Sequence, residues 1–487
     1  MSSIFTNKNT IHLAIDQGGH ASRAIAYNHE GEVLADAYQE IATHSREDGN
    51  IVEHDAEELV ASINTVINNV IHKLGTRADK IVNAGLATQR SNVVCWDRET
   101  GRALSPIISW RDRRHHQWLK QFVDRRDELH KLTGLQISAH YGASKLRWCL
   151  DNLDEVKQAH SEGRLCMGPM ASFLCFRLLK GQPFVTDNVN ASRTLLWGLK
   201  QRDWSNDLLE TFAIDRNCLP LCVPTQHEFG HLQHEQLNIP LSLVTGDQSA
   251  AMFAYGNIQP NTAYVNTGTG AFVSRPSGPV CVYGRRLLTS IIHQDNSHTS
   301  YVLEGTVNGA GSALEWARQN FGLEQNFYDA LQDYLETNQE EPPLFLNGVA
   351  GLAAPYWIGD FPIQFAGEGS LEAKLVAVVE SIVFLLCNNM AEMMKTSSPP
   401  EQIQITGGLA KLDGLCQRLA DLSNLPVYRT TECEATARGV AYLLAGQPQH
   451  WPETEPGMWF MPGMNTPLVA RYDRWEKAML SVMRKNP

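Results

Sequence analysis

The sequence predicts an α/β fold made of two related halves, and three observations support this prediction. Strand-like apolar runs alternate along the chain with segments that have the spacing of amphipathic helices. A strand, a glycine-containing turn and a second strand open the chain, and the same arrangement recurs about 250 residues later. With 487 residues the chain is also too long for one ordinary hydrophobic core, since domains average roughly 150 residues.

The first half begins with a strand that ends at the turn sequence Asp16-Gln17-Gly18-Gly19. Further along, residues 56–74 place apolar side chains three and four residues apart, which predicts an amphipathic helix. The other apolar runs are short and bounded by turn residues, which is typical of strands. The expected elements of this half are strands at 11–15, 24–27, 33–37, 81–86 and 92–96 and a helix at 56–74.

A strand that ends at Gly246-Asp247-Gln248, followed by a helix, closes the first half. Gly256, Pro260 and Asn261 then interrupt the pattern and mark a boundary. The second half opens with a strand, the turn Thr267-Gly268-Thr269-Gly270 and another strand, although two unrelated hairpins would also explain the repeated turn. The expected elements are strands at 241–245, 262–266, 271–275 and 402–406 and helices at 249–255, 311–320, 371–394, 413–422 and 435–444.

Charge and cysteine content limit the classes of function. The 41 basic and 53 acidic residues give a net charge of −12, which argues against binding to nucleic acid or to an anionic membrane. The ten cysteines form no CxxC pair, and Cys218 and Cys222 have no His or Cys partner at zinc-site spacing, so we expect reduced thiols. The amino terminus lacks a secretory signal pattern, and the apolar run at 375–387 is too short to cross a bilayer. We therefore expect a cytoplasmic protein.

Two glycine turns are candidates for phosphate contact. Gly18 and Gly19 leave backbone N–H groups free to face phosphate oxygens, while Asp16 could hold a hydrated Mg²⁺ ion and Arg23 could reach a phosphate. Gly408, which follows the strand at 402–406, is a candidate nucleotide contact. For each sequence taken alone, a plain hairpin and a simple strand-to-helix turn, respectively, are the more frequent explanations. No GK[ST] follows the second turn, so it is not a Walker A sequence.

A further carboxylate, Asp247, is expected at the amino end of a helix. It could take a proton from a hydroxyl while Gln248 binds another hydroxyl, or it could simply cap the helix. Arg90 and Trp110 add a guanidinium and an indole, a combination that suits the hydroxyls and the C–H face of a polyol. We expect a solvated charge cluster from most of the arginines that follow Trp110, namely Arg111, Arg113 and Arg114.

Short sequences recur in a fixed order between about residues 11 and 446: DQGxxxSR, ATQR, WDRETGRALSPIISWRDRR, TGL, GASKLRW, TDNVNASRTLLW, GDQ, NTGTGAF, LEGTVNGAGSALEW, APYW and TGGLAK. This order resembles that of the FGGY carbohydrate kinases, with the glycerol kinases nearest in these sequences. The resemblance implies two duplicated actin/hexokinase-like (ribonuclease H-like) domains with a catalytic cleft between them. Residues 1–256 would bind sugar or polyol, residues 257–450 would bind nucleotide, and residues 451–487 would pack on the body as a tail.

The same resemblance implies ATP-dependent phosphorylation of a primary hydroxyl of a small polyol or sugar, with Mg²⁺. Asp247 corresponds to the catalytic base, and Asp16 (through water) and Asp247 to the carboxylates on the Mg²⁺ side. The positions that correspond to substrate contacts are Arg90, Ser91, Trp110, His140, Gln248 and Phe272. The positions that correspond to nucleotide contacts are Gly18, Gly19, His20, Arg23, Thr269, Gly311, Glu315, Gly408 and Leu412. The family also suggests a homodimer.

Some of these positions depart from the family pattern. Ser91 stands where glycerol kinases carry an acidic residue, and His140 stands where they carry a tyrosine, for which Tyr141 could substitute. The loss of a carboxylate acceptor favours a larger or differently hydroxylated substrate, such as a pentulose. The departures on the nucleotide side are Gly19 and His20 in place of hydroxyl residues, Glu315 in place of glutamine and Leu412 in place of asparagine. A catalytically weakened sugar- or nucleotide-binding regulator on the same fold is therefore the alternative hypothesis.

Overall fold

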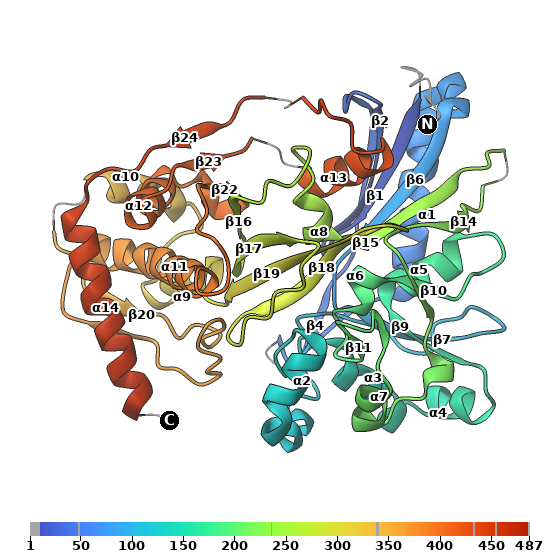
Figure 1. Ribbon diagram of the computed structural model, residues 1–487, viewed down its shortest axis with the longest axis horizontal. Helices are drawn as coiled ribbons and strands as arrows, with labels where there is room; N and C mark the ends of the chain where they lie inside the picture. The colour runs from blue at the N-terminus through green and yellow to red at the C-terminus, as the bar shows by residue number, and fades with distance from the viewer. Residues whose placement is uncertain are drawn as a thin grey trace.

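Two large β-sheets organise the chain, one in each half (Figure 1). The computed structural model describes residues 10–46, 49–234, 236–337, 340–431, 434–452 and 455–485. The first sheet has the order β14-β15-β6-β1-β2-β3, and its strands are β1 (Ile11–Gln17), β2 (Ala21–Asn28), β3 (Val33–Glu40), β6 (Ile81–Thr88), β14 (Gln226–His231) and β15 (Pro240–Gly246). The second has the order β18-β19-β17-β16-β22-β23-β24, with β16 (Thr262–Thr267), β17 (Ala271–Gly278), β18 (Leu288–Gln294), β19 (Thr299–Val307), β22 (Gln402–Thr406), β23 (Val427–Arg429) and β24 (Met458–Phe460).

Both sheets follow the same scheme. In the first, β1 pairs antiparallel with β2 and parallel with β6. In the second, β16 pairs antiparallel with β17 and parallel with β22. A glycine turn joins the antiparallel pair in each sheet, at Gly18–His20 and at Gly268–Gly270. The predicted α/β fold with two related halves is confirmed.

Shorter strands and helices complete the two halves. The small sheets contain β4 (His44–Arg46), β5 (Ile51–His54), β7 (Val93–Asp97), β8 (Ile107–Ile108), β9 (Leu165–Pro169), β10 (Val185–Asp187), β11 (Trp197–Gly198), β12 (Asp203–Trp204), β13 (Leu221–Val223), β20 (Leu344–Leu346) and β21 (Gln364–Ala366). The helices of the first half are α1 (Ala56–Leu74), α2 (Arg126–Thr133), α3 (Gly142–Asn152), α4 (Asp154–Ser161), α5 (Met170–Leu178), α6 (Asn188–Ala191), α7 (Asn206–Phe212) and α8 (Asp247–Ala251). Those of the second half are α9 (Gly311–Asn320), α10 (Phe327–Thr337), α11 (Leu371–Met393), α12 (Asp413–Ser423), α13 (Ala435–Leu444) and α14 (Thr466–Lys485). Among the described residues, 3₁₀ segments occur at Gly75–Lys80, Trp118–Arg125, Arg216–Cys218 and Gly408–Lys411.

Helix α1 shows why the helix prediction at 56–74 was accurate to the residue. Asp55 caps its amino end by accepting hydrogen bonds from the backbone N–H groups of Glu57 and Glu58, at 2.8 Å each. Gly75, with φ +57°, ends the helix. The apolar stripe is buried against β2 and β3 of the first sheet. The capping residues and the buried apolar stripe therefore indicate the same helix, and the caps determine where it begins and ends.

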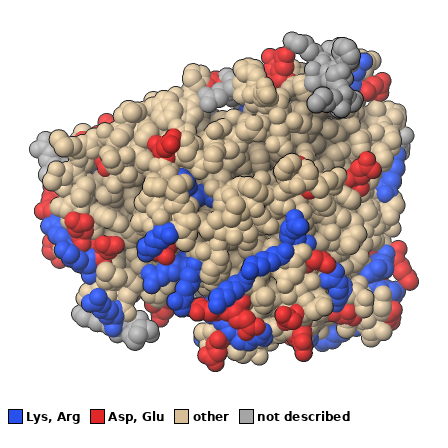
Figure 2. All heavy atoms as spheres, in the orientation of Figure 1, with Lys and Arg blue, Asp and Glu red and all other residues tan. Residues whose placement is uncertain are grey.

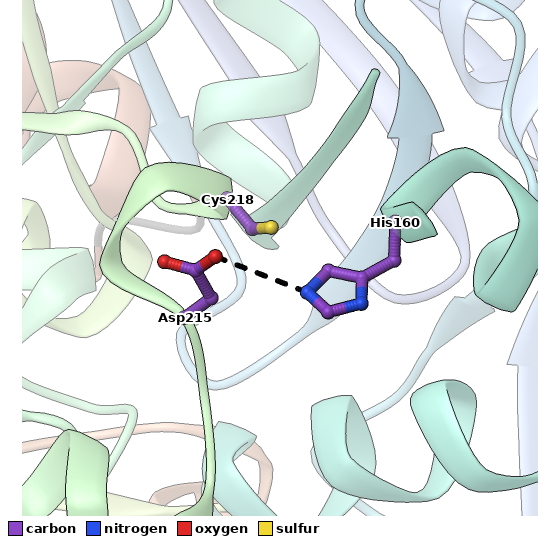
Figure 3. A group of neighbouring side chains, drawn as sticks. All are labelled: His160, Asp215 and Cys218. Carbon is purple, nitrogen blue, oxygen red and sulfur yellow. Dashed lines mark ion pairs between the residues drawn. The ribbon is translucent and has the colours of Figure 1, made fainter. Parts of the chain in front are cut away.

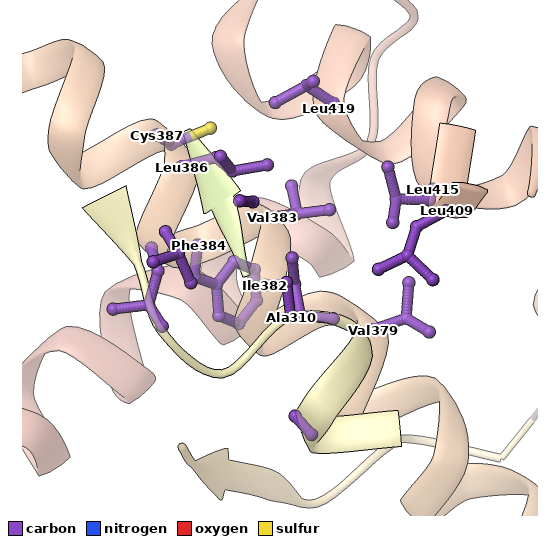
Figure 4. Packing of buried hydrophobic residues seen from close by; sticks show 14 of the residues in the cluster. Ala310, Val379, Ile382, Val383, Phe384, Leu386, Cys387, Leu409, Leu415 and Leu419 are labelled. Atoms are coloured by element: carbon purple, nitrogen blue, oxygen red, sulfur yellow. The ribbon is translucent and has the colours of Figure 1, made fainter. Parts of the chain in front are cut away.

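Helix α11 is the apolar run that was too short to span a membrane, and it forms the centre of the second half. Figure 4 shows Val379, Ile382 and Val383 of α11 beside Leu409 and Leu415 in this core. Buried Leu, Val or Ile side chains each contribute roughly 1.5–3 kcal/mol to folding. Because α11 is covered on nearly all sides, it is apolar around most of its circumference. No helix among the described residues is long and apolar enough to cross a membrane.

Helix α13 belongs to the second half in sequence but packs on the first sheet, against β1, β6 and α8 (Figure 1). A Cβ atom on Gly439 would lie 1.8 Å from the carbonyl oxygen of Ala250, so glycine is needed where α13 meets α8. The segment after α13 divides between the halves. Trp451 packs beside α13, whereas β24 extends the second sheet and α14 buries Trp475 in the second core.

Candidate active site

Three parallel neighbours, β15, β6 and β1, end at one edge of the first sheet. Thr88 at the end of β6 pairs with Gln17 of β1 and with Gly246 of β15. The carboxyl ends of adjacent parallel strands meet at the same edge, where ligands of open α/β sheets bind. Asp16, Arg90 and Asp247 lie at or just after these ends. The fold therefore brings together three residues that are far apart in the sequence.

A cavity of about 110 Å³ opens at this edge. Its wall comes from both halves of the chain, because Phe272 belongs to β17 of the second sheet. The lining residues are Gln89, Arg90, Trp110, His140, Arg193, Asp247, Gln248 and Phe272. Of the substrate-contact positions predicted from the sequence, all except Ser91 line this cavity.

Asp247 begins α8 and is half-buried in the cavity wall. One carboxylate oxygen, Oδ1, accepts a 2.7 Å hydrogen bond from the backbone N–H of Gln248. Burial raises the pKa of Asp247, although Arg90 and Arg193 oppose this shift. A carboxylate whose pKa is raised above its usual value, and which faces a cavity, is suited to accept a proton from a bound hydroxyl.

Arg90 is held in place by polar contacts on two sides. Its Nη2 atom donates to Oε1 of Gln248 within the first half and, at 3.1 Å, to Oε1 of Glu304 in the second half. Arg193, which follows α6, donates at 2.7 Å to the other oxygen of Glu304. Ser290 donates a third hydrogen bond to that carboxylate, at 2.5 Å. One carboxylate thus fixes two guanidinium groups that line the cavity.

Glu304 connects the two halves of the site. It lies on β19 of the second sheet and is 3% exposed. Burial alone would raise the pKa of Glu304, but Arg90 and Arg193 hold it at about 2. The carboxylate is therefore charged at every physiological pH. Because it is paired with two cations and accepts from Ser290, its burial leaves neither oxygen unsatisfied.

The opposite side of the cavity is aromatic. The rings of Trp110 and His140 lie 5.3 Å apart between centroids. Asn92 positions this wall, since its Oδ1 accepts from the Trp110 backbone N–H at 2.7 Å and its Nδ2 donates to Oε1 of Gln89 at 3.0 Å. Burial, followed by the charge of Arg193, lowers the pKa of His140 well below its usual value. The imidazole is therefore neutral, and the wall suits the C–H face of a polyol.

Three sequence positions need separate comment. Ser91 is buried beside the cavity, and its hydroxyl oxygen has no hydrogen-bond partner among the described residues. Tyr141 does not replace His140 in the cavity wall; its ring lies 5.3 Å from the Arg193 guanidinium instead. We expected Arg114 to belong to a solvated cluster. Instead it is paired with Asp112 and Glu53, at 2.8 and 2.6 Å. Arg111 is exposed.

Asp16 fits a cation site. It is buried, its Oδ1 has no hydrogen-bond partner among the described residues, and its Oδ2 is 3.7 Å from Nη1 of Arg23. Burial and then the negative charge of Asp247 raise the pKa of Asp16 to about 7. Two carboxylates that disfavour each other's charge, one with a free oxygen, form a donor set that hard cations such as Mg²⁺ prefer.

Replacing Asp16 with asparagine should change the stability of the protein by an amount that depends on pH. Its raised pKa means that the folded state keeps a proton that the unfolded chain releases between pH 3.8 and about 7. The stabilising contribution is full below pH 3.8, falls progressively as the pH rises and is lost above about 7. In cation-free buffer, the melting temperature of Asp16→Asn should therefore exceed that of the parent protein by clearly more at pH 8 than at pH 5.

The exposed Asp36 on the adjacent β3 supplies the control, since Asp36→Asn should not change the difference between the two pH values. Thermal melts at both pH values measure the stability effect. An Asp16→Asn protein that melts below the parent at pH 8 would show that this carboxylate is not strained by burial.

The glycine turns of the two sheets lie at corresponding places. In the first, Gly18 donates its N–H to the Ala21 carbonyl at 3.0 Å, and a Cβ on Gly19 would meet the Gln89 amide at 2.7 Å. His20 is exposed, and Arg23 lies 3.5 Å from Glu434. The first turn therefore touches a residue of the cavity wall.

In the second sheet, the turns after β16 and β22 are neighbours because these strands are parallel. Gly268, Thr269 and Gly408 are exposed there, and nothing lies within 4 Å of a Cβ built on Gly408. The N–H of Gly311, at the start of α9, donates to the carbonyl oxygen of Gly268 at 3.0 Å. This open backbone surface follows β16 directly and precedes Phe272 of the cavity by a few residues, which suits an elongated phosphate-bearing ligand.

Two predicted nucleotide positions have other partners. Glu315 on α9 accepts from Arg318 at 2.6 Å and from Gln319 at 2.7 Å. Leu412 is 5% exposed and packs in the second core, so its side chain faces away from the open turns. The contact of either residue with a nucleotide stays a prediction.

Sequence reasoning missed three residues of the site: Gln89, Arg193 and Glu304. Each lies inside one of the quoted sequences, ATQR, TDNVNASRTLLW and LEGTVNGAGSALEW, but received no role. Gln89 and Arg193 line the cavity, and Glu304 pairs with the arginines behind it. A buried acid inside an apolar strand was the available signal for Glu304, because such a charge needs a cationic partner.

Comparisons with known proteins cover most of the chain. Residues 11–254 match the N-terminal domain, and residues 263–446 the C-terminal domain, of the FGGY family of carbohydrate kinases. The chain is 34% identical to a glycerol kinase of Geobacter sp. (strain M21) over 440 residues, 88% of this chain and 89% of the relative. It is 31% identical to glycerol kinase 1 of Pseudomonas aeruginosa over 88% of this chain and 89% of the relative.

Solved structures share the whole architecture. The glycerol kinase of Plasmodium falciparum with ADP has a TM-score of 0.87 and 25% identity, covering 97% of this chain and 98% of that one. A ligand-bound xylulose kinase from Lactobacillus acidophilus has a TM-score of 0.82 and 20% identity, covering 98% of both chains. The second likeness concerns the fold alone.

Proposed function

Since this chain belongs to the FGGY family of carbohydrate kinases, we propose that it phosphorylates a primary hydroxyl of a three-to-five-carbon polyol or ketose, with Asp247 as the general base. The observation that carries this proposal is the half-buried Asp247 carboxylate in the wall of a cavity lined by Arg90 and Gln248. A cavity of about 110 Å³ is small, which suits a compound of a few carbons.

The proposed reaction uses the residues of both halves. Asp247 accepts the proton of the hydroxyl as its oxygen forms a bond to the terminal phosphorus of ATP, and the bond from that phosphorus to the bridging oxygen of ADP breaks. Arg90 and Gln248 orient the other hydroxyls, and Trp110 and Phe272 contact the carbon chain. Mg²⁺, when bound, would neutralise phosphate charge, and Asp16 would hold it through its water ligands.

Glycerol or a close relative is the first substrate class, and a pentulose is the second. The identity of at least 31% to two glycerol kinases supports the first. The missing acidic residue at Ser91 supports the second, because it removes a hydroxyl acceptor near Arg90. With either substrate class, the phosphoryl group would pass directly from ATP to the acceptor, and no residue of the protein would form a covalent bond to it.

A panel of polyols, ketoses and sugar acids, each assayed for ADP release with ATP and Mg²⁺, tests the proposal. We expect one three-to-five-carbon acceptor to raise ADP release far above the rate with water alone. If every acceptor leaves ADP release at background while ATP still binds, the protein is the regulator considered as the alternative, and the kinase proposal fails.

Replacing Ser91 with glutamate tests the substrate argument. Ser91 is buried and directly follows Arg90 in the chain, so a guanidinium is near the new carboxylate. Ser91→Glu should raise kcat/KM for glycerol relative to a pentulose by roughly ten-fold, the equivalent of one charge-assisted hydrogen bond. Ser91→Gln, of the same size without the charge, is the control. Equal ratios in both variants would contradict the argument.

A further inference from the structure

A second group of potential metal ligands lies outside the cavity. Among the described residues, His160, Asp215 and Cys218 bring one ligand atom each to within 4.8 Å of the others. Figure 3 shows their side chains converging on a common space. Nε2 of His160 is 3.9 Å from Oδ2 of Asp215. Sequence spacing gave no zinc pattern around Cys218, because His160 is far away in the chain and reaches it only through the fold.

The local backbone explains the convergence. Asp215 caps the 3₁₀ segment Arg216–Cys218, and its Oδ1 accepts from the Asn217 N–H at 2.9 Å, which leaves Oδ2 towards His160. The Cys218 N–H donates to the Asp215 carbonyl at 3.1 Å, so both residues belong to one tight turn. His160 stands in the last turn of α4. Two short elements thus supply all three ligands.

The three residues differ in exposure, so the group is open to solvent on one side only. Cys218 is 6% exposed and packs in the core of the first half, while the His160 and Asp215 side chains are 43% and 45% exposed. An ion among these three atoms would meet protein on the Cys218 side and water on the other. Such an arrangement of three protein ligands and one water is common for four-coordinate Zn²⁺.

The donor types select the metal. Imidazole nitrogen, carboxylate oxygen and thiolate sulfur are all zinc ligands, whereas Mg²⁺ and Ca²⁺ prefer oxygen alone. Ligands about 2.1 Å from a tetrahedral ion lie about 3.5 Å from one another. The observed 3.9 Å between His160 and Asp215 therefore needs only a small movement of two exposed side chains.

Some neighbouring charges favour a cation bound to these three residues and others oppose it. His160 is at the carboxyl end of α4, where the helix dipole favours a cation. Arg98, whose guanidinium donates to the Asn217 carbonyl at 3.0 Å, opposes a cation but lowers the pKa of the Cys218 thiol. Burial and Asp215 raise that pKa to about 11, so binding must displace the thiol proton into solvent.

We propose that His160, Asp215 and Cys218 bind one Zn²⁺ ion, with water as the fourth ligand. The ion ties the end of α4 to the turn at 215–218 and stabilises the first half. The site is separate from the cavity at Asp247, so phosphoryl transfer does not depend on it.

Titration of the chelator-treated full chain with Co²⁺, in excess Mg²⁺, tests this site. We expect visible bands of a tetrahedral ion together with a thiolate-to-cobalt charge-transfer band, all removed by one equivalent of Zn²⁺. Cys218→Ser should abolish the charge-transfer band, and His160→Gln, at an exposed position, should weaken Zn²⁺ binding at least ten-fold. Cys222→Ser, which changes a nearby half-buried thiol outside the group, should keep the band.

Thermal melts provide the second readout. Zn²⁺ should raise the melting temperature of the parent and of Cys222→Ser, and should not raise that of Cys218→Ser or His160→Gln. Absence of the charge-transfer band in the parent, or its persistence in Cys218→Ser, would overturn the proposal. ADP release in the acceptor panel should be the same for Cys218→Ser and the parent, so this result stands apart from the proposed kinase function.

Discussion

Replacing Asp247 with asparagine is expected to reduce the kcat of phosphoryl transfer by roughly 10²–10⁴-fold, the usual contribution of a general base. The amide has the same shape but cannot accept the proton of the attacking hydroxyl. Because burial already disfavours the charged carboxylate, the variant should fold as well as the parent. ADP release with the best acceptor measures the effect, and thermal melting measures the folding.

Binding of ATP is the control for this variant. Asp247→Asn should bind ATP about as tightly as the parent, since the open glycine turns of the second sheet are unchanged. A kcat within a few-fold of the parent value would remove Asp247 from its proposed role. If Asp247→Asn fails to fold, Asp247 acts mainly as a structural part of α8.

Replacing Glu304 with alanine is expected to have the largest effect on stability in the site. The change leaves Arg90 and Arg193 buried, at 7% and 2% exposure, without their shared carboxylate. Removing one partner of a buried ion pair costs about 3–5 kcal/mol. Urea unfolding should show this loss. Glu315→Ala, which removes an acid that pairs on the surface of α9, is the control and should change the midpoint little.

Glu304→Gln and Glu304→Asp keep part of the network and test the role of Glu304 in positioning Arg90. If Glu304 holds Arg90 against the acceptor, the KM for the acceptor should rise much more than the KM for ATP. Glu304→Asp, which keeps the charge, should be closer to the parent than Glu304→Gln. Equal changes in both KM values would mean that Glu304 contributes only to stability.

The sequence was sufficient for elements whose ends are decided locally. The helices at 56–74, 311–320 and 435–444 were predicted to the residue, because apolar spacing and flanking residues agree there. The helix expected at 249–255 is instead α8, Asp247–Ala251. The residues after it form tight turns, in which Phe253 and Ala254 donate to the carbonyls of Ala250 and Ala251. Alanine-rich sequence favours either form, and packing against α13 decides between them.

What the sequence could not supply depends on contacts across the chain. Nothing local to α13 indicates that it packs on the first sheet. Glu304 lies on a strand whose pairing with β17 sets it opposite Ser274, and its two arginines come from other elements. The group of His160, Asp215 and Cys218 likewise forms only because the fold brings His160 close to Cys218. Asp16 and Asp247 were candidates from their local turns, and they come to one edge because β1 and β15 both pair parallel with β6.

A crystal structure with the best acceptor of the panel and a non-hydrolysable ATP analogue tests the central claim most directly. The account predicts that the primary hydroxyl oxygen lies about 2.6–3.2 Å from a carboxylate oxygen of Asp247 and faces the terminal phosphate. The acceptor's other hydroxyls should contact Arg90 and Gln248. An acceptor bound elsewhere, or one whose reacting hydroxyl faces a different group while Asp247 contacts only protein, would contradict the account.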